Sequence, residues 1–387
     1  MRYAEASPRS GSFPDRRGSP RHKLVVLGLV GTAILTTPAI VHAAPNSQKT
    51  SQQGAATSPY KAAHNAFGQP DLGGSWSNAT LTTESRPKGA AGLVYSPADV
   101  KKLEDFALYE ERVGNMPTDP NAGADVPNGL ELRESFAHAS GETGGYNRGW
   151  LDPGNRVMRV NGEPRSSFLT TPDGKVPPRK TGVPIVTDNT YGGEGGRGGN
   201  TDNPESRPLG DQCLVFARNV GPPMLPNGFY NNDYQIVQSR DEIAILVEMM
   251  HDVRHIALGR KDHLPDTIRP WFGDSIGHWE GETLVVETTN MPRALAYNGS
   301  WRHLKVTERL TRIGKDRLLY QYTIEDPTMW EKPFSGEYEF HPLNGQIYEY
   351  ACHEGNYALE GILAGARQME HDAAAKSAAI PPKASSQ

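Results

Sequence analysis

The chain has 387 residues, a formal net charge of −5 at pH 7, and 41 glycines with 31 prolines. Glycine and proline make up nearly a fifth of the chain, against about 12% in average proteins, and this excess favours short strands and loops over long helices. The mildly acidic charge provides no broad basic surface, so we expect no nucleic-acid partner. The charged fraction of 22% is ordinary and argues against a wholly disordered chain.

Residues 1–44 are predicted to be a secretory signal peptide. Basic residues between positions 16 and 23 precede an apolar run from position 24 to about 41, and small residues follow at Ala43 and Ala44. A single transmembrane anchor is the alternative, but glycine, threonine and proline residues dilute the apolar run. The mature protein is therefore expected to be periplasmic or secreted, with no stable membrane anchor.

The predicted export bears on the redox state of the two cysteines, Cys213 and Cys352. An oxidising compartment permits a bridge between them, so we predict a disulfide, and two buried free thiols are the alternative. Closing so long a loop would stabilise the fold by about 4 kcal/mol according to the chain-entropy model.

The mature N-terminus is expected to begin as a flexible leader over residues 45–70, because serine, glutamine, alanine and threonine dominate its first part. The Gly-Ser-Trp sequence at 74–76 then begins a first strand and resembles the Gly-x-Trp start of lipocalin-type barrels. A helix is predicted over 97–114, since Ser96 can cap it, a proline stands at its first position and a glycine ends it.

The segment from 115 to 208 is the least regular part of the region 71–210. Many prolines interrupt it, and only residues 156–160 have the character of a strand. Its glycine run at 192–199 would cradle a phosphate only between a strand and a helix, and neither pattern is present, so we predict a loop there. We interpret the whole segment as loops that wrap over a barrel, in the manner of a lid.

Short strands with tight connections follow from residue 211 onward. The apolar patterns predict strands at 233–238, 242–249, 253–258, 282–289, 304–313, 317–325, 337–341 and 347–352. Helical spacing of apolar residues predicts one last helix up to residue 370, and 371–387 is expected to be a disordered tail. Consecutive strands without intervening helices are typical of an antiparallel sandwich or an up-and-down barrel. We therefore predict a mainly β protein, with an antiparallel up-and-down lipocalin-like barrel in residues 211–370.

The densest polar cluster contains Glu248, His251, Arg254 and His255. A carboxylate, an imidazole and a guanidinium that point into a barrel can bind a polar ligand or transfer protons, and a satisfied structural network is the alternative. The two histidines would form a zinc pair on a helix. Along a strand, however, four residues span about 13 Å, so no metal site is predicted.

A second cluster combines Cys352 with His353 and Glu354. Neighbouring residues on a strand face opposite ways, so the thiol and the imidazole cannot act as a nucleophile and base pair. His353 remains a candidate general base. The candidate catalytic set is thus Glu248, His251, Arg254 and His353.

Aromatic and acidic residues suggest a ligand-binding mouth. Trp271, Asp274 and Trp279 lie in a glycine-containing stretch, and Tyr357 follows the second cluster. Such residues suit the rim of a sugar or aromatic site, and aromatics that plug one end of the core are the alternative. Residues 273–277 also fit the Gly-x-Ser-x-Gly spelling of a hydrolase nucleophile elbow, but the strand–turn–helix context that an elbow requires is missing.

These segments together resemble a family of secreted bacterial proteins without an assigned activity. The resemblance is carried by residues 271–275, 277–288, 306–312, 350–357 and 361–367, including the Cys-His-Glu-Gly-Asn-Tyr sequence at 352–357. It covers somewhat less than the C-terminal half of the chain. It implies a lipocalin-like (calycin-type) barrel and no particular activity.

Two functions are compatible with these observations. The first is an exported enzyme that uses acid–base residues in a barrel cavity, such as a lyase, isomerase or hydrolase acting on a carbohydrate or aromatic compound. The second is a non-catalytic periplasmic protein that binds a small ligand. Neither requires a cofactor. Both predict that the candidate side chains line one cavity.

Overall fold

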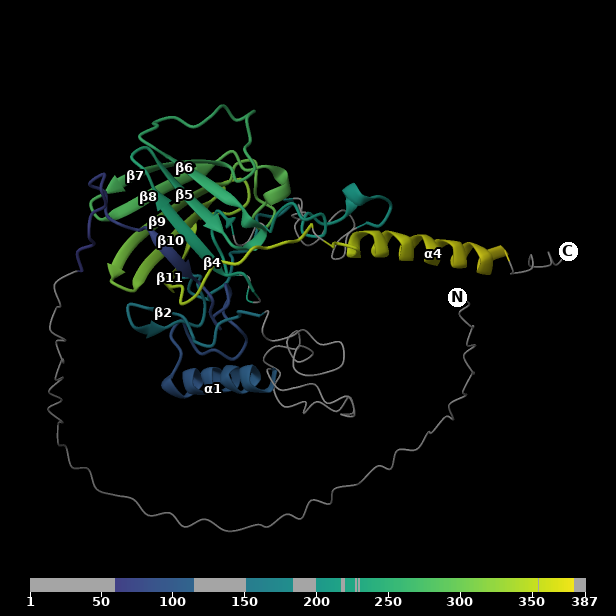
Figure 1. Cartoon of the computed structure of the whole chain (residues 1–387), viewed down its shortest axis with the longest axis horizontal. Coiled ribbons are helices and arrows are strands. Elements are labelled where there is room, and N and C mark those ends of the chain that lie inside the picture. Colours follow the sequence, from purple (N-terminus) through teal and green to yellow (C-terminus); the bar gives the residue numbers. More distant parts are fainter. Residues whose placement is uncertain are drawn as a thin grey trace, which may run out of the picture. The chain divides into compact units, whose positions relative to one another are not determined.

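The structure is a computed structural model that describes residues 60–114, 151–183, 200–216, 220–226, 228, 230–353 and 355–378 (Figure 1). The predicted signal peptide, most of the predicted leader, the glycine run at 192–199 and Glu354 lie outside the described residues.

Nine strands close into one barrel in the order β1-β11-β10-β9-β8-β7-β6-β5-β4 (Figure 1). The strands are β1 (Gly74–Ser77), β4 (Asp233–Gln238), β5 (Glu242–Val247), β6 (Val253–Leu258), β7 (Asp274–Glu280), β8 (Thr283–Thr289), β9 (Lys305–Gly314), β10 (Arg317–Glu325) and β11 (Phe334–Pro342). The predicted mainly β barrel is confirmed. One pair departs from the antiparallel pattern, because β6 and β7 run parallel over three residue pairs.

Strand β1 closes the barrel because it pairs with β4 on one side and β11 on the other. Its Trp76 is buried and donates a hydrogen bond from Nε1 to Leu72 O at 3.0 Å. The Arg312 guanidinium lies over the indole ring at 5.3 Å and donates to Asp71 O at 3.0 Å. The Gly-x-Trp start thus ties the first strand to the far end of β9.

Two sequence predictions fail in the barrel region. Residues 347–352 do not form a strand, because β11 already pairs with both β10 and β1 and the closed sheet offers no edge for another strand. Residues 274–280, which we expected to lie in a loop and a turn, form β7. Asp274, Ser275 and Gly277 hide the strand pattern, since polar residues and glycine are depleted in strands.

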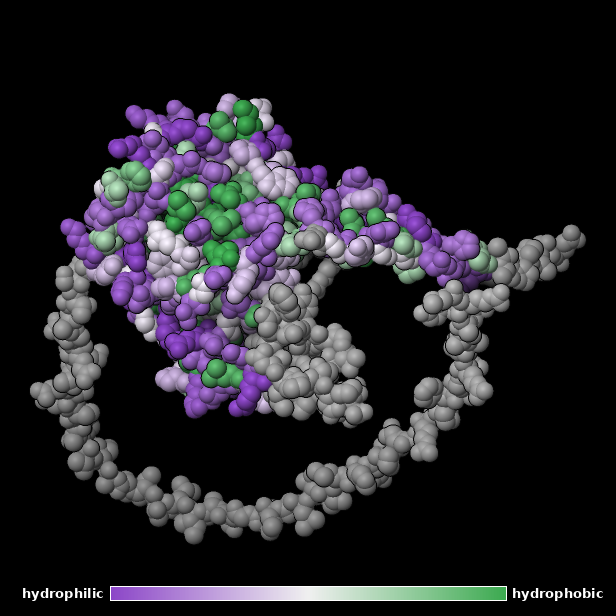
Figure 2. Space-filling view, in the orientation of Figure 1, coloured by the Kyte–Doolittle hydropathy of each residue, from purple (hydrophilic) through white to green (hydrophobic). Residues whose placement is uncertain are grey.

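The alternation of buried and partly exposed residues along the strands explains how the barrel core forms. Every second residue of β10 is buried, and these are Leu318, Tyr320, Tyr322 and Ile324. This is the period of two that a strand imposes on residues facing one side of a sheet. The residues between the buried ones face outward. Figure 2 shows that hydrophilic residues cover most of the visible face, with hydrophobic residues in small patches.

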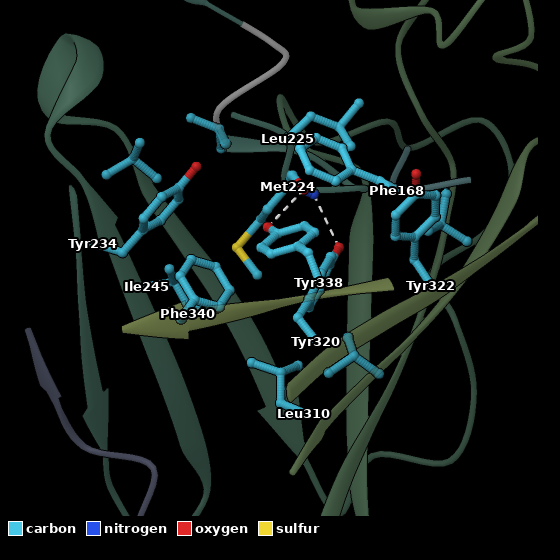
Figure 3. Packing of buried hydrophobic residues seen from close by; sticks show 14 of the residues in the cluster. Phe168, Met224, Leu225, Tyr234, Ile245, Leu310, Tyr320, Tyr322, Tyr338 and Phe340 are labelled. Atoms are coloured by element: carbon cyan, nitrogen blue, oxygen red, sulfur yellow. Dashed lines mark hydrogen bonds between the residues drawn. The ribbon is translucent and has the colours of Figure 1, made fainter. Parts of the chain in front are cut away.

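A covering segment, which here means the described residues between 151 and 226, supplies part of this core, and it extends beyond the predicted loops at 115–208 into the stretch before β4. Phe168, Met224 and Leu225 are buried and pack among the rings of Tyr320 and Tyr338 (Figure 3). Met224 N donates to Tyr320 Oη at 2.9 Å, and Tyr338 Oη donates to Met224 O at 2.9 Å. The barrel interior is therefore filled by its own covering segment where these residues lie.

The described helices are α1 (Pro97–Gly114) and α4 (Ala358–Ala378), with 3₁₀ turns η2 (Pro204–Ser206), η3 (Met249–His251) and η4 (Arg293–Leu295). Ser96 Oγ accepts a hydrogen bond from Asp99 N at 3.1 Å, as expected of an N-cap. Helix α4 continues past residue 370 into the predicted tail. The strand-like stretch at 156–160 contributes only β2 (Arg159–Val160), which pairs with β3 (Glu163–Pro164).

Candidate functional site

A surface groove of about 540 Å³ lies along the junction of β6 and β7. Its lining residues come from the β4–β5 turn, β5, β6, the segment before β7 and β7 itself: Asp241, Glu242, Val253, Arg254, His255, Ala257, Arg260, Pro270, Trp271, Phe272, Gly273, Asp274 and Ser275.

The groove exists because β6 and β7 separate at one end. Even-numbered β6 positions bond to β5, since Asp252 O accepts from Val247 N at 2.8 Å and Leu258 N donates to Asp241 O at 2.8 Å. Odd-numbered residues therefore turn their backbone groups toward β7. The β6–β7 register begins only at Ile256 and Ser275. At Val253 the barrel wall is consequently open.

One wall of the groove is aromatic. Trp271 is 41% exposed, and Phe272 beside it packs against the hydrophobic core. Gly273 allows this wall to approach β8, because its φ is +72° and an added Cβ would lie 2.7 Å from Thr289 O. The Trp271 indole is therefore exposed at the surface, while the residues that follow it pack against the hydrophobic core and β8.

Asp274 holds the loop before β7 in place. Its carboxylate pairs with Arg260 and accepts hydrogen bonds from His263 Nδ1 at 2.8 Å and Leu264 N at 2.9 Å. Burial raises the pKa of Asp274, but these three hydrogen bonds outweigh burial and leave the pKa below its usual value. On the opposite wall, His255 Nδ1 pairs with Glu242. The groove therefore presents one ion pair, Arg260–Asp274, and one histidine–carboxylate pair, His255–Glu242.

Arg254 lies behind the groove, inside the barrel wall, and is 1% exposed. Its guanidinium pairs with Glu308, donates to Ser275 Oγ at 3.2 Å and donates to Thr288 Oγ1 at 2.9 Å. Tyr320 Oη donates to Glu308 Oε1 at 2.7 Å. Burial lowers the pKa of Arg254, but the Glu308 carboxylate outweighs burial and raises it overall. This network ties β6 to β7, β8 and β9 across the junction.

The predicted catalytic residues do not share the groove. Glu248 is 4% exposed and accepts a hydrogen bond from Tyr348 N at 2.8 Å, and burial raises its pKa. His251, in η3, and His353, before α4, are both exposed. Arg254 alone lines the groove, and its donors are engaged with Glu308, Ser275 and Thr288. The four side chains are thus not brought into one cavity.

Two of the four predicted ligand-binding residues do meet. Trp271 and Asp274 both line the groove. Trp279 lies on β7 and packs against the core, and Tyr357 is 79% exposed just before α4. The Gly-x-Ser-x-Gly spelling carries no nucleophile elbow, because Ser275 sits within a strand and its hydroxyl bonds to Arg254 and Thr288.

Glu308 was not among the predicted site residues, although its signal was present. Val306, Glu308 and Leu310 are buried in alternation on β9, so parity places the carboxylate inward. Glu242, His255 and Arg260 carried no comparable signal. They face the groove only because distant strands and a long loop bring them together.

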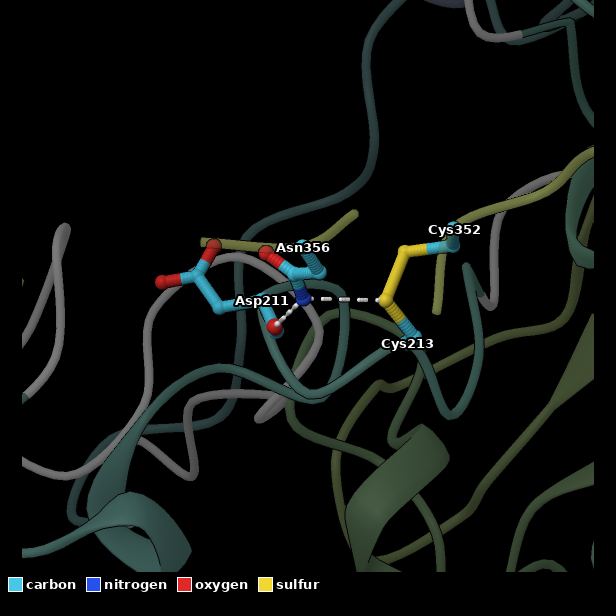
Figure 4. The surroundings of a disulfide bond; sticks show 4 residues. All are labelled: Asp211, Cys213, Cys352 and Asn356. Atoms are coloured by element: carbon cyan, nitrogen blue, oxygen red, sulfur yellow. Dashed lines mark hydrogen bonds between the residues drawn. A yellow bond between two sulfur atoms is a disulfide. The ribbon is translucent and has the colours of Figure 1, made fainter. Parts of the chain in front are cut away.

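The predicted disulfide is confirmed. Cys213 and Cys352 are bonded, with their Cα atoms 5.5 Å apart (Figure 4). Asn356 Nδ2 donates to Asp211 O at 3.3 Å and contacts Cys213 Sγ at 3.2 Å. The bridge joins the covering segment to the stretch that precedes α4.

Within the described ranges, no group of three or more histidine, cysteine, aspartate or glutamate side chains is arranged to hold a metal ion. No helix in the same part of the chain is long and apolar enough to cross a membrane.

No family model matches this chain, and no curated protein matches it. A crystal structure of a variant of the fluorescent protein UnaG is similar to part of it, with 17% sequence identity over 29% of this chain and 72% of that chain. The TM-score of this match is 0.20, which is too low to carry an argument about function.

Proposed function

We propose that this protein is an exported, non-catalytic binding protein for a small ligand, and that the ligand binds in the groove between β6 and β7. The observation that carries the proposal is the groove itself. Its volume of about 540 Å³ lies within the range of about 300–1,000 Å³ that small-ligand sites occupy. Trp271 offers an exposed aromatic face there, and the Arg260–Asp274 and His255–Glu242 pairs offer fixed polar groups.

Binding is better supported than acid–base catalysis. Both hypotheses predicted that the candidate catalytic side chains line one cavity, and the structure does not bring them together. The enzyme hypothesis depends on those side chains, which are Glu248, His251, Arg254 and His353, whereas ligand binding can use the groove without them. Arg254 is fully engaged by Glu308, Ser275 and Thr288, and the two histidines point to solvent elsewhere on the molecule. The residues that do converge, around Trp271 and Asp274, are those proposed for ligand contact.

Export is the second part of the proposal. A disulfide between Cys213 and Cys352 fits an oxidising compartment. The signal-like N-terminus and the resemblance to secreted bacterial proteins support the same location. Fractionation of the producing cell tests it, with the mature chain expected outside the cytoplasm and lacking the first 44 residues.

The binding site is tested by incubating the purified protein with a metabolite extract and identifying retained molecules by native mass spectrometry. Wild-type protein should retain an unchanged ligand. Trp271→Ala should weaken retention at least about tenfold, because an aromatic contact at a binding hot spot is worth more than about 1.4 kcal/mol.

Tyr357→Ala is the matched control, since it removes an exposed aromatic side chain that lies outside the groove. Loss of ligand in this control, with retention in Trp271→Ala, would place the site elsewhere. Conversion of the ligand to a product that His251→Ala or His353→Ala abolishes would support the enzyme instead.

A further inference from the structure

Beneath the groove, one residue of the barrel wall, Val253, has no strand partner on its β7 side among the described residues. Because even-numbered β6 residues bond to β5, the backbone N–H and C=O of Val253 face the β7 side. No described strand pairs with Val253 on that side, since the β6–β7 register begins at Ile256. An unpaired strand edge is a template for another extended backbone.

We propose that the ligand of the groove is a short extended peptide, which adds to the free edge of β6 as a strand. This inference rests on the proposed function and specifies its ligand class. Peptide recognition by strand addition takes affinity from main-chain hydrogen bonds and specificity from side-chain contacts. Both elements are present, because the free edge of Val253 lies beside the exposed indole of Trp271 in one groove.

The length of the free edge limits the length of the peptide. The free edge runs from Val253 to the N–H of His255, because the His255 carbonyl serves the Ile256–Ser275 pairing. A strand rises about 3.3 Å per residue, so about three peptide residues fill this edge. Val253 is itself 38% exposed and adds an apolar contact beside the edge. A peptide side chain that faces outward would lie between Val253 and Trp271, which favours an aromatic or β-branched residue there.

The charges around the groove favour a cationic peptide. Three carboxylates line it, from Asp241, Glu242 and Asp274, against the guanidiniums of Arg260 and Arg254 and the imidazole of His255. The Arg254 charge is balanced by Glu308 behind the wall, so the carboxylates remain in excess. Asp241 and Glu242 lie together at the β5 side of the groove. A lysine side chain or a free amino terminus directed there would complement the excess of negative charge. A neutral sugar would use Trp271 but would leave the strand edge unfilled.

The test compares two forms of one tetrapeptide, acetyl-Val-Phe-Val-Lys-amide, with and without N-methyl groups on its internal amides. N-methylation keeps the side chains and removes the donors that pair with a strand. Titration of the full mature protein, followed by tryptophan fluorescence and calorimetry, should show binding of the plain peptide. The N-methylated peptide should bind several-fold more weakly, because it loses the hydrogen bond to the Val253 carbonyl, and one such bond is worth about 0.5–1.5 kcal/mol.

A backbone variant provides the reciprocal test. Val253→Pro removes the N–H that faces the groove and leaves the β5 ladder unchanged, since Val253 does not bond to β5. It should weaken both peptides several-fold, because the peptide carbonyl that accepts from the Val253 N–H is present in both, and one such bond is worth about 0.5–1.5 kcal/mol. Val253→Thr is the control, because it keeps both the N–H and a β-branched side chain. If Val253→Pro fails to fold, the comparison of the two peptides still decides.

The outcomes separate this inference from the proposed function. Equal binding of both peptides would overturn strand addition and leave a side-chain site. Binding of a neutral oligosaccharide or an aromatic compound, with no binding of either peptide, would also overturn it and leave the groove as a ligand site. Failure of every ligand to respond to Trp271→Ala would overturn both.

Discussion

At the scale of single residues, burial and partners decide which ionisable groups are available. Arg254 has the chemistry of a ligand-binding residue, yet Glu308 and two hydroxyls occupy its guanidinium. Asp233 and Asp252 show the opposite case, since burial raises the pKa of each to about 7. These carboxyl groups are costly to ionise in the folded protein, because burial penalises the charged form.

Asp252→Asn should therefore stabilise the protein at neutral pH and flatten the dependence of its stability on pH. The folded pKa of Asp252, about 7, lies above its ordinary value of 3.8, so the folded state binds more protons between these values. Stability from this group is present below pH 3.8 and is lost as pH rises through 7. One Asp252 oxygen is also buried without a hydrogen-bond partner among the described residues. The amide keeps the shape without the charge.

Urea unfolding between pH 4 and 8 measures this effect. Asp316→Asn, at an exposed turn between β9 and β10, is the control and should follow the wild-type profile. Asp233 continues to titrate in both proteins, so the slope should decrease without vanishing. Identical profiles for Asp252→Asn and wild type would contradict the assignment.

At the scale of elements, strand β6 links the fold to the candidate site. It is fully paired with β5 but joins β7 over only three residue pairs. The short parallel junction is reinforced from inside by the Arg254 network, which contacts β7, β8 and β9. The Arg254 network thus bridges neighbouring strands next to the point where the β6–β7 pairing ends.

Glu308→Gln should destabilise the protein by about 3–5 kcal/mol, because it leaves the buried Arg254 charge without its counter-ion. Ser275→Ala should cost less, about 1.5–3 kcal/mol, since it removes hydrogen bonds to the same charged guanidinium but leaves its counter-ion in place. Urea denaturation of the purified variants measures both.

The exposed pair on the neighbouring strands supplies the control. Lys305 and Glu325 lie 3.9 Å apart near the surface, so Glu325→Gln should change stability by less than about 1 kcal/mol. If Glu308→Gln were no more harmful than Glu325→Gln, the Arg254 network would not secure the junction.

At the scale of the whole molecule, the covering segment and the barrel form one core. Met224 and Leu225 fill the interior between aromatic rings of β4, β10 and β11 (Figure 3). The disulfide then fastens this segment to the C-terminal stretch across a sequence separation of 139 residues (Figure 4). Long-range closure of this kind restricts the unfolded chain more than it changes the native contacts.

Reduction of the disulfide should lower the free energy of unfolding by about 2–4 kcal/mol while the barrel stays folded. The reason is that the core strands do not depend on the bridge for their pairing. Denaturation with and without dithiothreitol measures the loss, and far-UV circular dichroism should show an unchanged β spectrum. The double variant Cys213→Ala, Cys352→Ala should be insensitive to dithiothreitol. An unfolded spectrum after reduction would show that the bridge is required for the fold itself.

Local patterns were sufficient to predict the class of the fold, most barrel strands, helix α1 and the pairing of two cysteines. Period-two burial, capping and composition are local signals, so they can be recognised without knowing what lies nearby. The sequence also singled out Trp271 and Asp274. The tertiary structure decided what local signals cannot carry: that β7 is a strand, that residues 347–352 are not, and that Arg254 is occupied by Glu308. These outcomes depend on which edges remain open and which side chains meet, and both follow from barrel closure between segments distant in the chain.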